Sequence, residues 1–402
     1  MTRVQVSPTK LWTYVRSTLR LDSFFRRPGD QRLRPQIPAR DLVWSQVLAR
    51  VLRTSSFHGL ETLVHSTAPS SLHISRRFSE DTLGYFDERL DPAPTRQALA
   101  NTLKLAKRNK AFHGEPWIGL ALDGTSAGKT SRKAPLCKLC RPVKDGTDQV
   151  VGHRHELSMA SVVGKRLRLP FDVEPYGPGD CELNASRRLL ARSVAAVGPR
   201  FVQYVVADAK YGAASFLNDV IALGLDAVVR LKDNLPDLHA RAVARFNARP
   251  PDLVQNIDGR QVELWDDDDF LPWEGLNWES VRVFRYRYRT KGGEDFVEAY
   301  WLTSLPKSRA GSTTLFELAK TRWAIENEGF NEAKTRLGME HICRHDANAV
   351  LVSWLLMLLA LVILTLYRLC HLHRGSHEPH PAAELVTLLW VALGRPAVQD
   401  SS

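Results

Sequence analysis

A long uncharged run near the C-terminal end limits the folds that this chain can adopt. Residues 349–367 read AVLVSWLLMLLALVILTLY, without a single charged side chain. A helix of this length could span a membrane. A helix that is buried on all sides in a protein core is also apolar all round. Because the remainder of the chain is polar and globular in composition, we favour the buried helix, and a membrane-anchored protein is the alternative.

The composition indicates a polyanionic partner. The chain has 402 residues, of which 55 are Lys or Arg and 44 are Asp or Glu, so its formal net charge is +11. This balance is typical of nucleic-acid-binding proteins, although basic proteins without such a partner exist. The 44% of hydrophobic residues is too high for a disordered chain. Five cysteines are few and odd in number and no signal peptide begins the chain, so we expect a cytoplasmic location without disulfides.

Changes in periodicity predict a division of the chain into five parts. The first part is helical and rich in arginine, which fits either a DNA-binding domain or a solvated helical surface. An α/β catalytic core follows, interrupted by a β-rich insertion, and a helical segment or tail ends the chain. The predicted boundaries are 1–115 for the helical domain, 116–232 for the first part of the core, 233–305 for the insertion, 306–375 for the rest of the core and 376–402 for the tail.

The second part predicts a mixed sheet with helices on its faces. Strand patterns and turn residues predict three strands joined by hairpins, then helix, strand, helix and strand. The first strand is expected to end at Asp123 and the fourth at Asp208. The helices between the later strands are expected at 181–197 and 213–223, and the last strand at 227–232. Ligands of such sheets bind at the carboxyl ends of strands, so both aspartates are candidate site residues.

The predicted insertion contains two further strands, at 281–289 and 296–303. The first alternates arginines with aromatic residues, which would suit contact with a phosphate backbone, but an ordinary half-exposed strand is slightly preferred. The run of four aspartates at 266–269 resembles a metal site only at first sight. Consecutive carboxylates point in different directions, so we expect a solvated acidic loop there.

A third acidic residue, Glu326, lies in a stretch that is expected to be helical from 312 to 338. Arg322, Phe330 and Lys334 lie four or eight residues away and would fall on or near the same face. Carboxylates on a rigid scaffold can bind divalent metal ions, and such ions promote phosphodiester cleavage. If Asp123, Asp208 and Glu326 converge, they would form the site of a metal-dependent nucleic-acid enzyme.

Three segments together resemble the motifs of bacterial insertion-sequence transposases of the DDE superfamily. They are LDGT at 122–125, VADAKYG at 206–212 and RWAIENEGFNEAK at 322–334. The third resembles the glutamate helix of that family, and a strand-rich stretch separates it from the second, as in the members with a β-rich insertion. At two positions the chain departs from the family pattern. Ala319 stands where a tyrosine is usual, and Ala333 stands where a lysine is usual, with Lys334 following.

The resemblance implies a ribonuclease H-like fold and a DNA transposase. Such an enzyme cleaves at the ends of a mobile element and joins the 3′-hydroxyl ends to target DNA by two-metal-ion chemistry. The catalytic and metal-binding residues that it implies are Asp123, Asp208 and Glu326, with Glu328 as an alternative ligand, and the cofactor would be Mg²⁺ or Mn²⁺. A relative of the same fold that binds DNA but has lost catalysis is the alternative.

The resemblance also implies how the chain meets DNA. The residues expected to contact it are Arg322, Lys334, Lys210 and Trp323. The partner would be double-stranded DNA, both element ends and target, and the protein would act as a dimer on DNA. It would work at the nucleoid in the bacterial cytoplasm.

Cys137 and Cys140 precede His153 and His155, a spacing that permits a zinc site. The two histidines would face the same side of a strand, and zinc normally prefers a wider second pair. The sequence therefore favours a basic loop with incidental cysteines over structural zinc.

Overall fold

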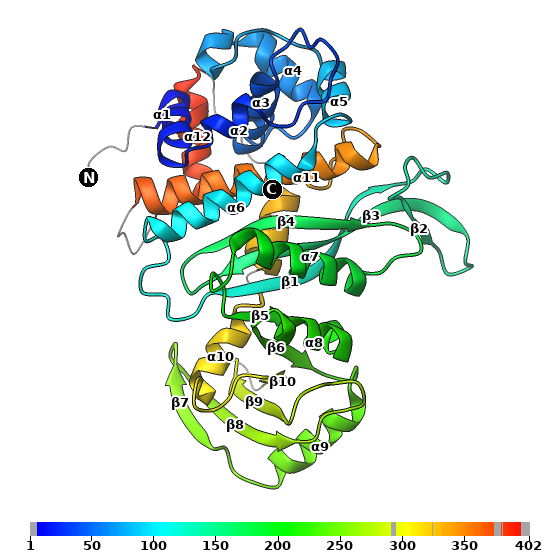
Figure 1. Ribbon diagram of the computed structural model, residues 1–402, viewed down its shortest axis with the longest axis vertical. Coiled ribbons are helices and arrows are strands. Elements are labelled where there is room, and N and C mark those ends of the chain that lie inside the picture. The colour runs from blue at the N-terminus through cyan, green and yellow to red at the C-terminus, as the bar shows by residue number, and fades with distance from the viewer. Residues whose placement is uncertain (1–5, 291–294, 324, 374–378, 380, 395–402) are drawn as a thin grey trace.

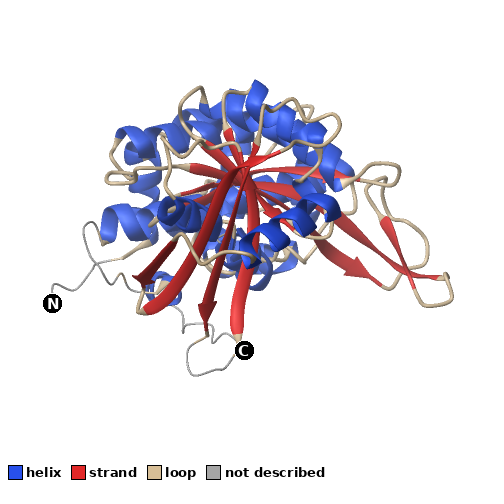
Figure 2. Cartoon of the chain, turned by 90° about the horizontal axis from the view of Figure 1, so that it is seen from below, coloured by secondary structure: helices blue, strands red, loops and turns tan. Residues whose placement is uncertain are grey.

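The computed structural model describes residues 6–290, 295–323, 325–373, 379 and 381–394. Within them, one twisted sheet runs through the middle and lower parts of the molecule, and the N-terminal helices form a layer above it (Figure 1). The strand order is β2-β3-β1-β5-β6-β10-β9-β8-β7, with β4 paired to the side of β3. Seen from below, the strands fan out and the ribbon of β2 and β3 projects from the body (Figure 2).

The N-terminal part is helical, as its periodicity predicts. Its α-helices are α1 (Pro8–Thr13), α2 (Asp22–Arg26), α3 (Ala39–Val51), α4 (Phe57–Ser66), α5 (Glu80–Asp87) and α6 (Pro92–Arg108). Polar side chains accept hydrogen bonds at several helix starts. Ser56 accepts one from the amide of Gly59, and Asp91 accepts one from the amide of Ala93.

The core of the sheet has the predicted order of elements. Three antiparallel strands come first, and two strands parallel to β1 follow with helices between them. The elements are β1 (Gly119–Thr130), β3 (Val150–Val163), β4 (Arg168–Tyr176), α7 (Glu182–Val197), β5 (Tyr204–Ala207), α8 (Ala214–Ala222) and β6 (Asp226–Leu231), with the short β2 (Arg141–Lys144) before β3. The mixed α/β sheet with helices on its faces, of ribonuclease H-like type, is confirmed.

The prediction that Asp123 ends its strand is wrong. β1 continues to Thr130, and Asp123 pairs with Met159 of β3. The strand continues because β3 is long enough to stay hydrogen-bonded beside it. The pairing of β1 with the shorter β5, in contrast, stops at Leu122 and Ala207. Asp123 is thus the first residue of β1 beyond the end of its parallel neighbour.

The segment predicted as an insertion, 233–305, contains α9 (Pro236–Asn247), β7 (Leu253–Ile257), β8 (Arg260–Phe270), β9 (Val281–Arg289) and β10 (Phe296–Thr303), and its strands continue the same sheet. The solvated loop expected at 266–269 is wrong, because these residues belong to β8. The Asp266 side chain is buried, and the guanidinium of Arg282 on β9 donates to it at 2.7 Å. β9 lies between β8 and β10 and is buried over most of its length, so it is not an edge that contacts phosphates.

The helix expected from 312 to 338 is not continuous. It consists of α10 (Ser312–Lys320) and two π-helical segments, Ile325–Phe330 and Glu332–Arg336. The first π-helical segment packs against β1 and β4. π-helical turns are rare and occur frequently at functional sites. Glu326 lies in this segment.

The uncharged run forms α11 (Ala347–Leu366), which a π-helical turn extends to Leu372. Among the described residues it is the helix long and apolar enough to cross a membrane, yet 83% of its most apolar window is buried inside the protein. It packs against β4 and against α3, α5 and α6. The buried helix that the sequence favours is therefore the arrangement observed, and α12 (Ala382–Ala392) lies beyond it.

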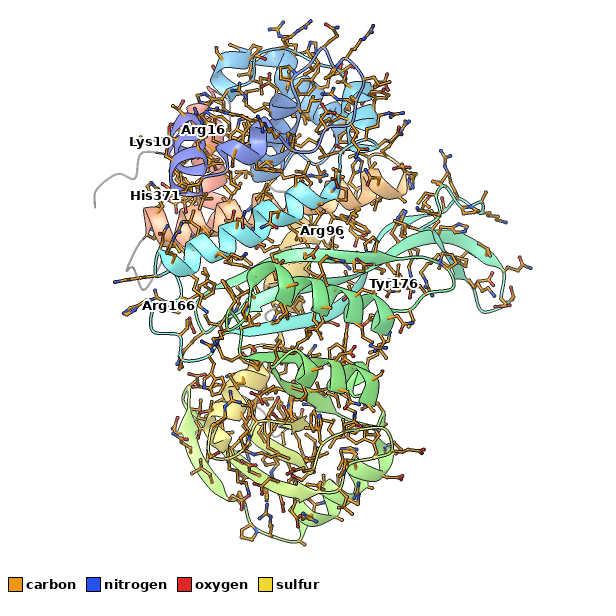
Figure 3. All side chains as sticks on the ribbon, viewed as in Figure 1. Lys10, Arg16, Arg96, Arg166, Tyr176 and His371 are labelled. Atoms are coloured by element: carbon orange, nitrogen blue, oxygen red, sulfur yellow. The ribbon has the colours of Figure 1, made fainter. Side chains whose placement is uncertain are left out.

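Partly buried ion pairs join two helices to the sheet. Arg96 on α6 reaches down to β4 (Figure 3), where its guanidinium donates to Asp172 at 3.0 Å. Arg192 on α7 donates to the other oxygen of the same carboxylate at 2.7 Å. One carboxylate on β4 thus binds α6 of the N-terminal helical layer and α7 of the core. These bonds fix the helical layer relative to the sheet.

Candidate active site

Asp123 and Asp208 lie side by side on neighbouring strands. Leu122 on β1 is in register with Ala207 on β5, and each aspartate is the next residue of its strand. The residues before them are apolar and buried, which holds both backbones in the sheet. After Asp208 the chain turns into a short 3-10 helix, Ala209–Tyr211. The sheet therefore brings the two sequence-predicted aspartates together.

Arg322 links the third acid to this pair. Its Nη1 atom lies 2.7 Å from Oε1 of Glu326 and 3.9 Å from Oδ2 of Asp123. Only 11% of the Arg322 side chain is exposed. The carboxylates of Asp123 and Glu326 are thus both within reach of a single nitrogen atom, so the structure brings Glu326 to the same end of the sheet.

Asp208 is the more open of the two aspartates. Its side chain is 37% exposed, against 15% for Asp123. The Nζ atom of Lys232, one residue beyond the end of β6, lies 4.0 Å from Oδ1 of Asp208. Asp208 therefore faces solvent and an exposed cationic side chain, whereas Asp123 is enclosed by protein.

The enclosure of Asp123 changes its protonation. Its pKa is raised to about 7, mainly by burial and to a smaller extent by the nearby carboxylates of Glu182 and Glu326. The amide of Gly124, which donates to Oδ1 at 2.9 Å, and the guanidinium of Arg322 oppose this rise. A bound cation at this position would favour the ionised form of Asp123.

Glu182 is a fourth acid at this site that sequence reasoning missed. It lies in the first turn of α7, and its carboxylate packs directly over Gly124, where a Cβ atom would be 2.1 Å from Cδ of Glu182. The hydroxyl of Tyr211 donates to it at 3.0 Å and the ammonium of Lys210 at 2.8 Å. The glycine after Asp123 therefore makes room for this acid, and the LDGT motif was the signal that could have indicated a close neighbour.

The residues predicted to contact DNA are spread around the site. Arg322 lies between two of the acids, and Lys210 is 59% exposed beside Glu182. Trp323 is half-buried, and Lys334 pairs with Glu340 at 3.5 Å. The side chain of Glu328, the alternative ligand, lies outside the described part of the structure.

The donor set fits a hard divalent cation. Oxygen ligands from several carboxylates suit Mg²⁺ or Mn²⁺, and the position of Arg322 between Asp123 and Glu326 shows that a positive charge is favourable there. Within the described residues, the three acids are not close enough for all their ligand atoms to lie within 4.8 Å of one another; Cys137, Cys140 and His155 are. The acids thus form an open site, in which the side chains of Asp208 and Glu326 are 37% and 45% exposed.

Comparison with known proteins places this geometry in a family. The sequence matches the transposase DDE domain over residues 119–363, which includes Asp123, Asp208 and Glu326. No match was found among curated proteins. Among solved structures, the chain is similar to the piggyBac transposase of a synaptic complex with hairpin DNA, with 11% identity and a TM-score of 0.46, over 98% of this chain and 83% of that one. Because the family match covers more than half of the chain, this protein belongs to the transposase DDE-domain family.

Proposed function

We propose that this protein cleaves DNA at the ends of a mobile element and joins the 3′-hydroxyl ends to target DNA, with Asp123, Asp208 and Glu326 as the metal-binding catalytic residues. The observation that carries the proposal is the meeting of two aspartates on adjacent parallel strands with a glutamate through one buried arginine. Four carboxylates, counting Glu182, gather where the surrounding surface also carries lysines.

Divalent ions, Mg²⁺ or Mn²⁺, would supply activation of the attacking oxygen and stabilisation of the leaving oxygen. The protein's own contribution starts with Asp123, which must lose its proton before it can bind a cation. Arg322 keeps Asp123 and Glu326 in position through its contacts with both. Its charge also offsets that of the carboxylates and of an incoming phosphate.

The exposed lysines supply contacts for the phosphate backbone. Lys210 follows Asp208 by two residues, and Lys232 lies 4.0 Å from its carboxylate. The two lysine side chains are 59% and 53% exposed. Both are held by acids of the site, Glu182 and Asp208. When phosphates approach, such lysines can exchange a carboxylate partner for a phosphate partner. Lys334 and Trp323 would contact DNA farther along the glutamate segment.

Joining two element ends to one target requires that both ends be held together. We therefore propose a dimer on DNA, at the nucleoid of a bacterial cytoplasm. Mass photometry with a DNA duplex that carries one element end should detect a complex with two protein chains. A complex with one chain at all concentrations would argue against the dimer.

The direct test is nicking of a supercoiled plasmid that carries the DNA flanking the gene, in Mg²⁺. The parent protein should nick it, and Asp123→Ala, Asp208→Ala and Glu326→Ala should not. Asp269→Ala is the matched control, since that carboxylate is exposed and lies on β8 in the insertion. If the three variants nick as well as the parent, the site assignment is wrong. If the parent binds DNA but never nicks it, the protein is a relative that has lost catalysis.

A further inference from the structure

A second group of potential ligands lies near the C-terminal end of β1, at the loop that follows Thr130. The Sγ atoms of Cys137 and Cys140 are 3.8 Å apart, and Nε2 of His155 lies 3.2 Å from the first and 3.8 Å from the second. Two thiolates bound to one tetrahedral zinc ion, at about 2.3 Å each, stand about 3.8 Å apart, and a thiolate and an imidazole nitrogen about 3.5 Å apart. The three atoms thus already have the spacing of zinc ligands.

The surroundings of this cluster contain polar atoms without partners. His155 is 1% exposed, and its Nδ1 atom is buried without a hydrogen bond. The Nδ1 atom of His345 is buried and unpartnered as well, and the two imidazole rings lie 5.7 Å apart. Two imidazoles on one tetrahedral zinc have centroids roughly 5 Å apart, from the Zn–N bond length. His345 therefore lies beside the group, but its nitrogens are not within 4.8 Å of all three other ligand atoms, so its side chain would have to turn toward them to become the fourth ligand.

We propose that Cys137, Cys140, His155 and His345 form a structural zinc site. Two thiolates and two imidazoles are a common donor set for structural zinc, and a closed set of four protein ligands distinguishes such a site from a catalytic one. Its metal would also differ from that of the acids. Soft sulfur ligands select zinc, whereas carboxylates suit Mg²⁺ or Mn²⁺.

The protonation of the cluster is compatible with metal binding. Burial lowers the pKa of His155 to about 4, so its imidazole is neutral at physiological pH and has a free nitrogen lone pair. Burial raises the pKa of the Cys137 thiol, so in the absence of metal the sulfur keeps its proton. Zinc binding would release that proton, as metal binding to cysteine does in general.

The site would fix a basic surface loop. Residues 131–140 connect β1 to β2, and the segment from Lys129 to Lys144 has six basic residues and no acid. The two cysteines lie in this loop, His155 lies on β3 and His345 lies just before α11. Zinc would therefore tie the loop to the base of the projecting β2–β3 ribbon and to the buried helix. Without it, the loop would be held mainly by weak thiol contacts.

A disulfide is the competing fate of two cysteines at this spacing. The Sγ atoms are nearly twice as far apart as the roughly 2.05 Å of a disulfide bond. Both sulfurs also lie within 3.8 Å of the same histidine nitrogen, which would take no part in a disulfide bond. The geometry therefore favours a shared ion over a covalent bond.

The first test measures the metal content of the full-length protein. The protein is purified under reducing conditions and analysed by inductively coupled plasma mass spectrometry. We expect one zinc per chain. Cys140→Ser, His155→Ala and His345→Ala should each lower the zinc content to a small fraction of the parent value. His153→Ala is the matched control, since His153 is buried on the same face of β3 but bonds to the carbonyl of Arg132 at 3.0 Å. It should keep its zinc.

Two further measurements keep the proposal falsifiable if a variant folds poorly. Cys137→His keeps a metal ligand at the half-buried position 137 and should therefore retain zinc, in contrast to Cys140→Ser. Cobalt added to metal-free parent protein should give the visible bands of a tetrahedral, thiolate-bound ion. Trypsin should cut the exposed Lys133 in metal-free protein and leave it intact in the zinc form.

The proposal is overturned if the parent binds no zinc after reconstitution, or if His153→Ala loses zinc to the same degree as His155→Ala. Equal trypsin cleavage with and without zinc would also contradict the role in holding the loop. A disulfide between Cys137 and Cys140 in protein from a reducing cytoplasm would replace the zinc site altogether. None of these results bears on nicking by the acids, so failure here leaves the proposed function standing.

Discussion

Two groups of candidate metal ligands lie near β1, one around Asp123 on that strand and one around His155 on the neighbouring β3, and they differ in donor type and in burial. The acids around Asp123 are oxygen donors at a partly open site, and the guanidinium of Arg322 bridges two of them, Asp123 and Glu326. The cluster around His155 combines sulfur and nitrogen donors that already lie within 4.8 Å of one another and are mostly buried. Neighbouring parts of one sheet thus carry a partly open group of carboxylates and a more enclosed group of sulfur and nitrogen donors.

The difference follows from what each site would do. A catalytic metal site needs free positions for water and substrate, so its protein ligands cannot surround the ion. A structural site has no such need, and closure around the ion contributes directly to folding free energy. Changes in the two groups should therefore separate activity from stability.

The largest expected effect is on cleavage. Asp123→Ala should lower the plasmid nicking rate by roughly a thousandfold or more, since a catalytic ion supplies several kcal/mol of transition-state stabilisation. Its zinc content and melting temperature should stay close to those of the parent. A variant that loses both activity and zinc would show that the two sites are not separable.

The next effect is on stability. Cys140→Ser should lower the free energy of unfolding by about 4 kcal/mol when free zinc exceeds the dissociation constant a thousandfold, because a ligand that binds only the folded state stabilises it. Thermal unfolding with and without added zinc measures this. Nicking at a temperature well below the melting point should fall only a few-fold. An unchanged melting temperature would mean that the cluster does not hold zinc.

A smaller effect concerns pH. Asp123 has a pKa raised to about 7, so the ionised form needed for metal binding is lost as pH falls through 7. Glu182→Gln removes one of the charges that raise this pKa, and the acid limb of the nicking rate should move to lower pH. The control is Asp219→Asn on α8, which removes the ion-pair partner of Arg187, a residue of the helix that carries Glu182. This variant should leave the acid limb of the nicking rate in place. A shift in the opposite direction would contradict the role of Glu182.

The smallest effect distinguishes two neighbouring glutamates. Glu326 bonds to Arg322, whose guanidinium also reaches Asp123, so Glu326→Ala should behave like Asp123→Ala. Glu328→Ala should keep nicking within about twofold of the parent, the range expected of a substitution that leaves the metal ligands in place. The reverse result would identify Glu328 as the ligand.

Most elements of the α/β core could be predicted from the sequence, because buried strands and capped helices have local signatures. The two strands of the insertion have the observed bounds, and the helix predicted from Cys181 begins one residue later, with Cys181 as its N-cap. Features that depend on pairing partners could not be predicted. β1 continues past Asp123 because β3 stays beside it, and Asp266 is buried because Arg282 lies on the adjacent strand.

The two groups of ligands differ in the same way. The three acids stand in sequence motifs that can be compared with a family. The Cys–Cys–His cluster depends on which histidine of β3 faces the loop and on a distant residue, His345, brought close by the fold. The sequence offered His153 as a partner of equal standing, and the structure pairs it with the Arg132 carbonyl instead. Glu182 was missed for a similar reason, since only the packing of α7 on β1 brings it beside Gly124.

The most direct test of the central claim is the metal preference of Asp208→Cys. If the Asp208 carboxylate binds the catalytic ion, a thiolate in its place should bind Mg²⁺ poorly and the softer Mn²⁺ better. We expect this variant to nick plasmid DNA in Mn²⁺ but not in Mg²⁺, while the parent nicks in both. Equal nicking by Asp208→Cys in the two metals, at the rate of the parent, would show that Asp208 does not hold the ion.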